Sequence, residues 1–387
     1  MKKVALAINY DYHDYGGMLQ AFATQTALSK FGVDSEAIDF SCLKSDINKR
    51  KWKYFLSNVS DLSILKEKGR VFGKKLRMKV DSALGKNMQL RDTAFDQFCK
   101  ARFKVTTAYD SWDALNAGCR DYDAVIVGSD QLWLPSNVEG DYYTLNFVPN
   151  DVKKIAYATS FGIGNIPQKM EHLYSQFLKR IEYLSAREFS GQEIIKKCIN
   201  RDVPLVCDPT LLLEKEDWDE IATPQRLITD DYIFCYFMGD NPEQREFVKR
   251  LAKKKNCKIV GLLHLDQYIS SDEKYIDYAP YDINPADFVN LVKNARFVCT
   301  DSFHGTVFSI IFSKDFFTFR RFNKKASLST NTRLFSLLNK LELTDRLFDG
   351  SESVEKDMSV QNYSEVQKVL ASFREASIHY LMSSIES

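Results

Sequence analysis

The chain opens with the apolar run Val4-Ala5-Leu6-Ala7-Ile8, followed by a polar segment from Asn9 to Gly17 and then by Met18 to Phe31. The first run is apolar without interruption, which is typical of a parallel strand covered on both faces. The polar segment contains two glycines, and Met18 to Phe31 has a helical pattern that ends at Gly32. Val33 to Phe40 then predicts a second strand. The order strand, helix, strand indicates an α/β domain with a parallel sheet.

Length and composition limit the class of protein. The chain has 387 residues, of which 44% are hydrophobic and 27% charged, with 53 Lys and Arg against 52 Asp and Glu. This length predicts two domains, and the ordinary apolar fraction excludes a disordered or collagen-like chain. The balance of charges argues against a nucleic-acid partner. No apolar run approaches 18 residues, so we expect no membrane span.

Cysteine and histidine usage indicates neither disulfides nor a metal centre. The eight cysteines are scattered singly, without any CxxC pair, and the five histidines are not clustered. This pattern favours reduced thiols and no zinc site. The run Val4–Ile8 is too short for a signal peptide, and no small-residue cleavage site follows it. We therefore expect a cytoplasmic protein.

Apolar runs that end in polar residues recur along the whole chain. They are Asp123–Val127, Lys154–Ser160, Ile181–Ala186 and Val203–Cys207 in the first half, and Tyr232–Met238, Lys258–Leu263, Ala295–Cys299 and Phe316–Phe319 in the second half. The sequence therefore predicts two Rossmann-like domains that face each other across a cleft. A GxGxxG motif and a Walker lysine are absent, so there is no nucleotide fingerprint.

The expected division of the chain follows from these runs. Residues 1–213 form the N-terminal Rossmann-like domain, the polar residues 214–230 a linker, residues 231–350 the C-terminal Rossmann-like domain, and residues 351–387 a helical segment that packs back. Residues 49–80, within the first domain, contain eleven Lys and Arg against two acidic residues, with four interleaved aromatic residues. Such a segment can lie on an anionic membrane surface, or it is a solvated helical insertion.

The densest polar cluster, Asp301-Ser302-Phe303-His304-Gly305-Thr306, lies at a predicted strand-to-helix turn. Helix N-termini bind anions readily, and Ser302 and Thr306 can add hydroxyl donors, while Gly305 allows close backbone approach. His304 can carry or deliver a proton near neutral pH. The alternative is a simple N-cap turn with a surface histidine.

Three arginines follow this turn: Arg320, Arg321 and Arg333. The planar guanidinium fork fits phosphate and carboxylate groups, although surface arginines are also common. Their position after the turn favours a binding site for a small anion in the C-terminal half.

Six blocks in order give the chain a resemblance to the polysaccharide pyruvyl transferase family. The blocks are Tyr15 to Ala21, Val127 to Trp133, Ser185 to Glu188, Cys207 to Leu212, Thr300 to Phe308, and Asn331 to Arg333. The resemblance implies a glycosyltransferase-B-like fold and transfer of a pyruvyl group from phosphoenolpyruvate to a sugar of a surface polysaccharide or its lipid-linked precursor. The product would be a cyclic pyruvate ketal, with phosphate released and no cofactor or metal needed.

The resemblance also suggests roles for individual residues. His304 would be the general acid or the phosphate partner, and Asp130 would accept the hydroxyl proton. The donor would lie in the C-terminal half and the acceptor against the N-terminal loops. The expected donor residues are Ser302, Gly305, Thr306, Arg320, Arg321 and Arg333, and the expected acceptor residues are Gly16, Gly17, Gln20, Ser129, Trp133 and Arg187.

Other interpretations of these residues stay open. Asp130 could instead be a helix-cap carboxylate, Trp133 a core aromatic residue, and Arg187 could reach either ligand; Asp208, before a proline, is expected as a structural turn residue. For the whole protein, the alternatives are a sugar-nucleotide-dependent glycosyltransferase of the same fold and a non-catalytic saccharide-binding subunit of a polysaccharide assembly complex.

Overall fold

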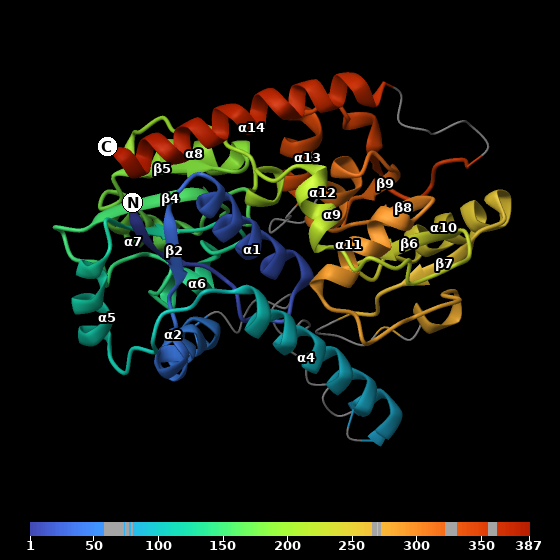
Figure 1. Cartoon of the computed structure of the whole chain (residues 1–387), viewed down its shortest axis with the longest axis horizontal. Coiled ribbons are helices and arrows are strands. Elements are labelled where there is room, and N and C mark those ends of the chain that lie inside the picture. The colour runs from blue at the N-terminus through green and yellow to red at the C-terminus, as the bar shows by residue number, and fades with distance from the viewer. Residues whose placement is uncertain are drawn as a thin grey trace.

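A computed structural model of the chain describes residues 1–57, 73, 77–78, 80–264, 269, 272–321, 331–354 and 362–387. In these residues the strands form two parallel five-stranded sheets, with the orders β2-β1-β3-β4-β5 and β10-β9-β8-β6-β7. Figure 1 shows the two sheets side by side, each with helices packed around it. The predicted α/β fold of two Rossmann-like domains is confirmed.

The N-terminal domain carries the first sheet. Its strands are β1 (Lys3–Ala7), β2 (Asp34–Ala37), β3 (Ala124–Val127), β4 (Lys153–Thr159) and β5 (Tyr183–Ala186). Its helices are α1 (Tyr15–Lys30), α2 (Lys44–Leu56), α4 (Ser82–Arg102), α5 (Trp112–Gly118), α6 (Pro135–Glu139), α7 (Glu171–Leu178) and α8 (Phe189–Ile199), with the 3-10 turns η1 (Ser41–Leu43), η2 (Cys119–Asp121), η3 (Gln168–Met170) and η4 (Pro209–Leu211).

The C-terminal domain carries the second sheet. Its strands are β6 (Tyr232–Tyr236), β7 (Lys258–Gly261), β8 (Phe297–Thr300), β9 (Asp315–Phe319) and β10 (Leu347–Phe348). The remaining helices are α9 (Lys215–Ile221), α10 (Pro242–Lys255), α11 (Pro285–Asn294), α12 (Phe303–Ile311), α13 (Asn331–Lys340) and α14 (Tyr363–Glu386), with the turns η5 (Asp272–Lys274) and η6 (Thr344–Arg346).

Helix α1 is buried on nearly all sides, because it lies between the two domains. The Asp14 side chain caps its N-terminus by accepting a hydrogen bond from the Gly17 N–H at 2.6 Å. Toward the second domain, Tyr15 stacks on Phe288 of α11 at 5.1 Å and donates a hydrogen bond to the Ile283 carbonyl. The first helix of the chain is therefore an interdomain element, and its N-terminus faces the junction.

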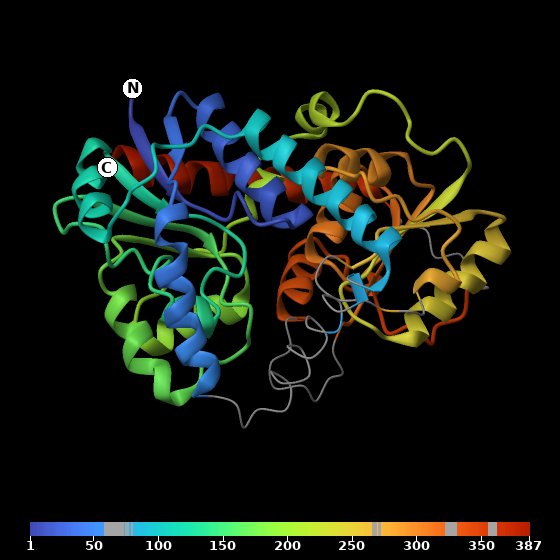
Figure 2. The ribbon, with the colours of Figure 1, turned by 90° about the horizontal axis from the view of Figure 1, so that it is seen from below.

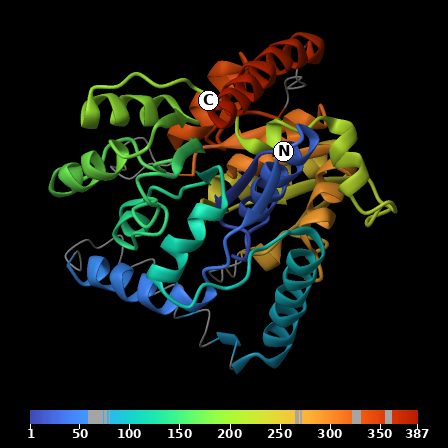
Figure 3. The same cartoon turned by 60° about the vertical axis from the view of Figure 1, so that its left-hand side comes forward.

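Helix α14 returns across both domains, as predicted (Figure 1). Near its start, Gln367 donates to the carbonyl of Ile310 in α12 at 2.9 Å. Further along, the Ser377 hydroxyl accepts a hydrogen bond from the Cys207 N–H of the first domain, also at 2.9 Å. Figure 3 shows α14 on the side of the molecule opposite α2 and α4.

The segment 214–230 is not simply the polar linker that its composition predicts, because it contains helix α9. Glu214 and Asp217 form a capping box at the start of this helix. The indole of Trp218 is fully buried. It packs edge-on against Phe308 and at a tilted angle against Phe22. One apolar side chain therefore anchors the connection between the domains.

The basic segment 49–80 is described only in part. Its first residues form the end of α2, where Trp52 and Leu56 are exposed; residues 58–72, 74–76 and 79 lie outside the described residues. The membrane contact suggested for this segment stays a prediction. Among the described residues, no helix is both long and apolar enough to span a bilayer.

Helix α4 joins the two domains through a buried arginine. Figure 2 shows α4 crossing the junction between the two halves. The Arg91 guanidinium is fully buried and donates to the carbonyl of Leu263 at 2.7 Å and to those of Tyr281 and Pro280 at 3.4 Å. It also lies 4.9 Å from the centre of the Tyr281 ring. This side chain satisfies three carbonyl groups of the second domain.

Replacing Arg91 by methionine tests this connection. The substitution keeps the apolar stem but leaves carbonyl groups of the second domain without a donor, so we expect a loss of about 3 kcal/mol in the free energy of unfolding. The measurement is the urea midpoint followed by tryptophan fluorescence. Arg120→Met is the control, because Arg120 pairs with Asp151 on the surface, and it should change little. Equal effects of the two substitutions would contradict the role of Arg91.

Candidate functional site

The carboxylate of Asp208 lies at the centre of the site. Its Oδ1 accepts hydrogen bonds from the N–H and the hydroxyl of Thr210 at 3.0 and 2.6 Å. Its Oδ2 accepts from the Ser129 hydroxyl at 2.7 Å and from Nη1 of Arg187 at 2.5 Å. Burial alone would raise the pKa of Asp208, but the neighbouring His304 and Arg187 hold it well below its usual value. Asp208 is therefore ionised, and it is more than the turn residue expected from the sequence.

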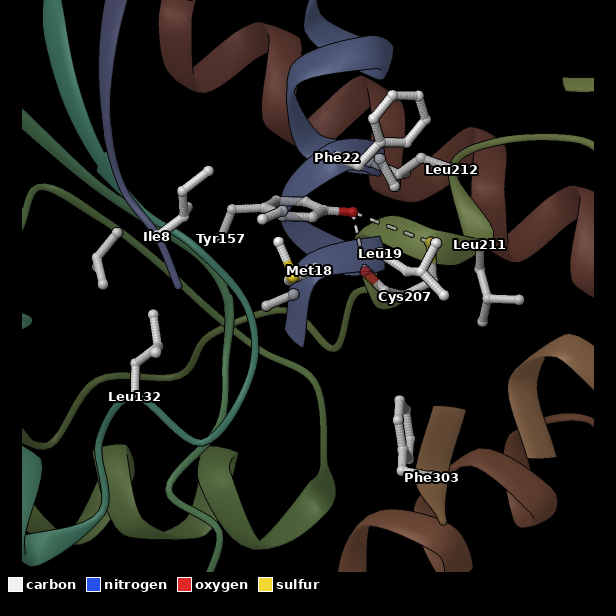
Figure 4. Packing of buried hydrophobic residues seen from close by; sticks show 14 of the residues in the cluster. Ile8, Met18, Leu19, Phe22, Leu132, Tyr157, Cys207, Leu211, Leu212 and Phe303 are labelled. Carbon is white, nitrogen blue, oxygen red and sulfur yellow. Dashed lines mark hydrogen bonds between the residues drawn. The ribbon is translucent and has the colours of Figure 1, made fainter. Parts of the chain in front are cut away.

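Contacts from the core fix the segment before Asp208. The Tyr157 hydroxyl donates to the carbonyl of Cys207 at 3.0 Å, as Figure 4 shows. The N–H of Cys207 donates in turn to Ser377 of α14. Because both backbone groups of Cys207 have partners, the Asp208 carboxylate is held by the sheet and by the C-terminal helix together.

Arg187, at the end of β5, has two donor atoms without partners. Its Nη1 also donates to the Ser129 hydroxyl at 3.1 Å. Its Nε and Nη2 are buried and have no hydrogen-bond partner among the described residues. The nearest carboxylate oxygens, from Glu188 and Asp130, lie 3.7 and 3.9 Å away. Buried charged donors without partners are costly, so this guanidinium is suited to bind an anion.

His304 reaches this cluster from the second domain. It lies in the first turn of α12, whose N-cap is Ser302. Its Nε2 is 3.7 Å from Oδ2 of Asp208, too far for a hydrogen bond, and it is buried without a partner in the described structure. The preceding residue, Phe303, places its ring 4.4 Å from the guanidinium carbon of Arg187. The imidazole and the guanidinium therefore face the same space between the domains.

Gly16 makes the approach of His304 possible. A Cβ atom at Gly16 would lie 2.0 Å from Nδ1 of His304, a distance that no real side chain adopts. Gly16 was expected to form part of the acceptor site. In this structure it is the position at which the N-terminus of α1 packs against the imidazole of the other domain.

Gly305 and Thr306 have structural roles in addition to the predicted contacts with a donor, which stay a prediction. A Cβ atom at Gly305 would lie 2.5 Å from the hydroxyl oxygen of Thr300, so glycine allows α12 to pack on β8. The Thr306 hydroxyl is fully buried and hydrogen-bonds to the Thr318 hydroxyl of β9 at 2.8 Å. The Thr306 hydroxyl is therefore directed toward the sheet.

Arg333 brings a second guanidinium to the site from α13. Burial, followed by the positive charges of Arg187 and Arg321, lowers its pKa to about 9. The side-chain oxygen of Gln131, when turned toward it, accepts from its Nε and Nη1 at 3.2 and 2.9 Å. Its guanidinium carbon lies 5.8 Å from the Phe303 ring, on which Arg187 also packs. The charged form of Arg333 is therefore disfavoured in this structure, both by burial and by the neighbouring guanidinium groups.

Of the other two predicted donor arginines, Arg321 lies at the edge of this cluster. Its Nη2 donates to the carbonyl of Asp301 at 3.1 Å. The Asp301 carboxylate accepts from the N–H groups of Met238 and Gly239 at 2.6 and 2.8 Å, which holds the loop after β6. For Arg320, the backbone N–H donates a hydrogen bond to the Phe348 carbonyl at the end of β10. Its contact with a donor stays a prediction.

Asp130 lies on the first-domain side of the site in a strained conformation. Its φ angle is +80°, which is uncommon for a residue other than glycine and is often found at functional sites. Gly17 packs close to its carboxylate, since a Cβ at that position would lie 3.6 Å from Oδ2. Gln20 donates to the Gly17 carbonyl at 2.9 Å, and its own Oε1 is buried without a partner in the described residues. The Ser129 hydroxyl, by contrast, donates its hydrogen bond to the Asp208 carboxylate.

Trp133 presents no ring face to a sugar in this structure. It is fully buried between Phe161 and Phe177, and its indole N–H donates to the Tyr143 carbonyl at 3.0 Å. The alternative of a core aromatic residue is therefore the one observed.

Glu188 is a site residue to which the sequence assigned no role. Its Oε1 accepts hydrogen bonds from the Ser160 hydroxyl at 2.8 Å and the Phe161 N–H at 3.1 Å. Its Oε2 is buried without a partner within the described parts of the chain. Burial raises its pKa, and the opposing effect of Arg187 is smaller. A charged pair directly after an apolar strand was the signal that could have identified it.

The fold and the site together define a two-domain α/β protein with a buried, cation-rich site formed by side chains of both domains. The family model described as polysaccharide pyruvyl transferase matches residues 14–321. The chain therefore belongs to the polysaccharide pyruvyl transferase family. No curated protein matches it.

Several solved structures of sugar-processing enzymes are similar to the chain over its length. UDP-N-acetylglucosamine 2-epimerase from Rickettsia bellii is 12% identical, with a TM-score of 0.48, and the match covers 100% of this chain and 97% of that one. UDP-GlcNAc 2-epimerase from Neisseria meningitidis is 11% identical, with a TM-score of 0.45 and coverage of 99% and 100%. The E. coli ADP-heptose lps heptosyltransferase II is 10% identical, with a TM-score of 0.39 and coverage of 98% and 99%.

The environment of Glu188 predicts an unusual pH dependence of stability. Because its pKa is raised in the folded protein, the ionised form destabilises the fold, and this cost disappears as the pH falls below the pKa of the unfolded chain. Glu188→Gln should therefore raise the urea midpoint at pH 7 to 8, and the gain should shrink toward pH 4.

Glu36→Gln is the matched control for this experiment. Although burial raises the pKa of Glu36, hydrogen bonds from Tyr122 and Lys3 make it lower overall. Its ionised form therefore stabilises the fold, so the substitution should cost stability at neutral pH and less in acid. If Glu188→Gln followed the same trend as Glu36→Gln, the assignment for Glu188 would be wrong.

Proposed function

We propose that the protein transfers the pyruvyl group of phosphoenolpyruvate to two hydroxyls of one sugar in a surface polysaccharide or its lipid-linked precursor. The product is a cyclic pyruvate ketal, and phosphate is released. The observation that carries the proposal is the pair formed by Arg187 and His304, which come from different domains and both present buried polar atoms without partners. Membership of the pyruvyl transferase family supports the same reaction.

The cations of the site are suited to the donor. Phosphoenolpyruvate carries a phosphate and a carboxylate, and the free Nε and Nη2 of Arg187 form a fork that fits either group. Arg333 adds a second guanidinium, whose lowered pKa rises again when an anion binds beside it. We therefore assign Arg187 to the donor, together with His304 and Arg333.

The reaction needs one proton at C3 of the donor and the loss of one proton from each sugar hydroxyl. His304 supplies the proton to C3, which leaves C2 oxocarbenium-like and open to attack by the first hydroxyl. Asp130, which is partly exposed on the first-domain side, accepts the proton of this hydroxyl. The second hydroxyl then displaces phosphate, and the phosphate takes up the proton of this hydroxyl. The arginines stabilise the negative charge that develops on the leaving phosphate.

The decisive assay measures phosphate released from phosphoenolpyruvate in the presence of saccharides with two free hydroxyls. His304→Ala should lower the rate at least a hundredfold, because it removes the proton donor. His379→Ala is the matched control, since His379 is exposed on α14, and it should leave the rate unchanged. Normal turnover by His304→Ala would end the assignment.

A second substitution tests the binding of the donor. Arg187→Lys keeps the positive charge but loses the planar fork, so we expect the KM for phosphoenolpyruvate to rise about tenfold or more with a smaller effect on kcat. Binding measured by calorimetry should weaken in parallel. Tight binding of uridine diphosphate, with no binding of phosphoenolpyruvate to the wild-type protein, would instead favour a sugar-nucleotide-dependent glycosyltransferase.

A further inference from the structure

One buried tyrosine at the domain junction has a hydroxyl group without a partner. Tyr236 is the last residue of β6, and it pairs in register with Thr300, which precedes the turn that carries His304. Its side chain is almost completely buried, and its hydroxyl forms no hydrogen bond with any described residue. A buried hydroxyl in this state costs roughly 1–3 kcal/mol, so such groups are uncommon, and a bound ligand is one explanation for them.

The surroundings of Tyr236 place its hydroxyl between the two domains. Its ring packs edge-on against Tyr15 of α1 at 5.8 Å and against Phe288 of α11 at 5.1 Å. The ring is thus held by elements of both domains. Burial raises the pKa of Tyr236 most, followed by Asp14 and Tyr15, while Arg321 and Arg91 oppose the increase. The contact with Tyr15 places the ring where the end of β6 meets the N-terminus of α1.

The chemistry of the group indicates what it binds. Burial raises the pKa of Tyr236 well above its usual value, so the phenol stays protonated and can donate a hydrogen bond. Arg321 adds a positive charge at the loop that follows β6, because its Nη2 donates to the carbonyl of Asp301, whose carboxylate accepts from the Met238 N–H. A neutral donor next to a guanidinium is complementary to an anionic oxygen.

We propose that Tyr236 is a ligand-binding residue whose hydroxyl donates to an anionic oxygen of the donor substrate beside Arg321. The proposal rests on the proposed function for the identity of that donor, and it extends the site beyond the residues Arg187, His304 and Arg333. The hydroxyl has no partner among the described residues, and the ligand supplies one when it binds.

The chain contains a matched control for this residue. Tyr142 is also fully buried, and its hydroxyl likewise forms no hydrogen bond in the described structure. It lies in the first domain among Phe40, Tyr143 and Phe147, away from the junction. Tyr236→Phe and Tyr142→Phe therefore remove the same group from the same kind of environment, and only one of them is at the site.

The test combines thermal stability with binding. In the absence of ligand, both variants should melt at the wild-type temperature or above it, because each loses an unsatisfied hydroxyl. Calorimetric titration with phosphoenolpyruvate should show about tenfold weaker binding for Tyr236→Phe and no change for Tyr142→Phe. Parallel titrations with inorganic phosphate and with pyruvate identify which anionic group the hydroxyl contacts.

Two outcomes would overturn the proposal: unchanged binding of phosphoenolpyruvate by Tyr236→Phe, or a clear fall in its melting temperature, which would reveal a structural partner. Failure of the proposed function is a separate result. In that case the wild-type protein itself does not bind phosphoenolpyruvate, while the stabilities of the two variants still show whether the Tyr236 hydroxyl is unsatisfied.

Discussion

The buried ion pair between Arg187 and Asp208 is the interaction on which the rest of the site depends. Both side chains are almost completely shielded from water, so either charge alone would be strongly destabilising. Thr210 and Ser129 donate hydrogen bonds to the Asp208 carboxylate and hold it in place. Asp208 in turn accepts from Nη1 of Arg187 and fixes that edge of the guanidinium. The other two donor atoms of Arg187 remain without partners. The same geometry thus secures the arginine in the fold and leaves it ready for an anion.

Charged side chains of both domains meet at the site. Arg187 and Asp208 belong to the first domain, whereas His304 and Arg333 belong to the second. Burial lowers the pKa of Arg333 most, and the positive charges of Arg187 and Arg321 lower it further. Arg187 is balanced by Asp208, whereas the charge on Arg333 is disfavoured, and an anion beside Arg333 would remove this cost. Under the proposed function, a donor with two anionic groups would therefore stabilise the arrangement in which both domains contact it.

Local patterns predicted the fold and the strand-to-helix turn that carries His304, whereas the contacts within the site depend on residues far apart in the chain. The strand Val4–Ile8 and the turn with His304 are readable because each depends on neighbouring residues. The role of Asp208 was missed, since Ser129 lies 79 residues and Arg187 21 residues away in the chain. The contact of Thr306 with Thr318 could not be predicted either, because Thr306 lies in α12 and Thr318 in strand β9.

Helix α1 fixes the position of the two halves of the site relative to each other. Its N-terminus meets His304 through the missing side chain of Gly16, while Tyr15 beside it packs on the second domain. The helix interior is buried against the first domain, so the helix cannot shift toward one domain without disturbing the other. The sequence pattern placed Gly16 in a polar segment before the helix, whereas in the structure it belongs to the first turn of α1. Its actual importance is steric, because only the absence of a Cβ atom allows the imidazole to reach Asp208 and the free edge of Arg187.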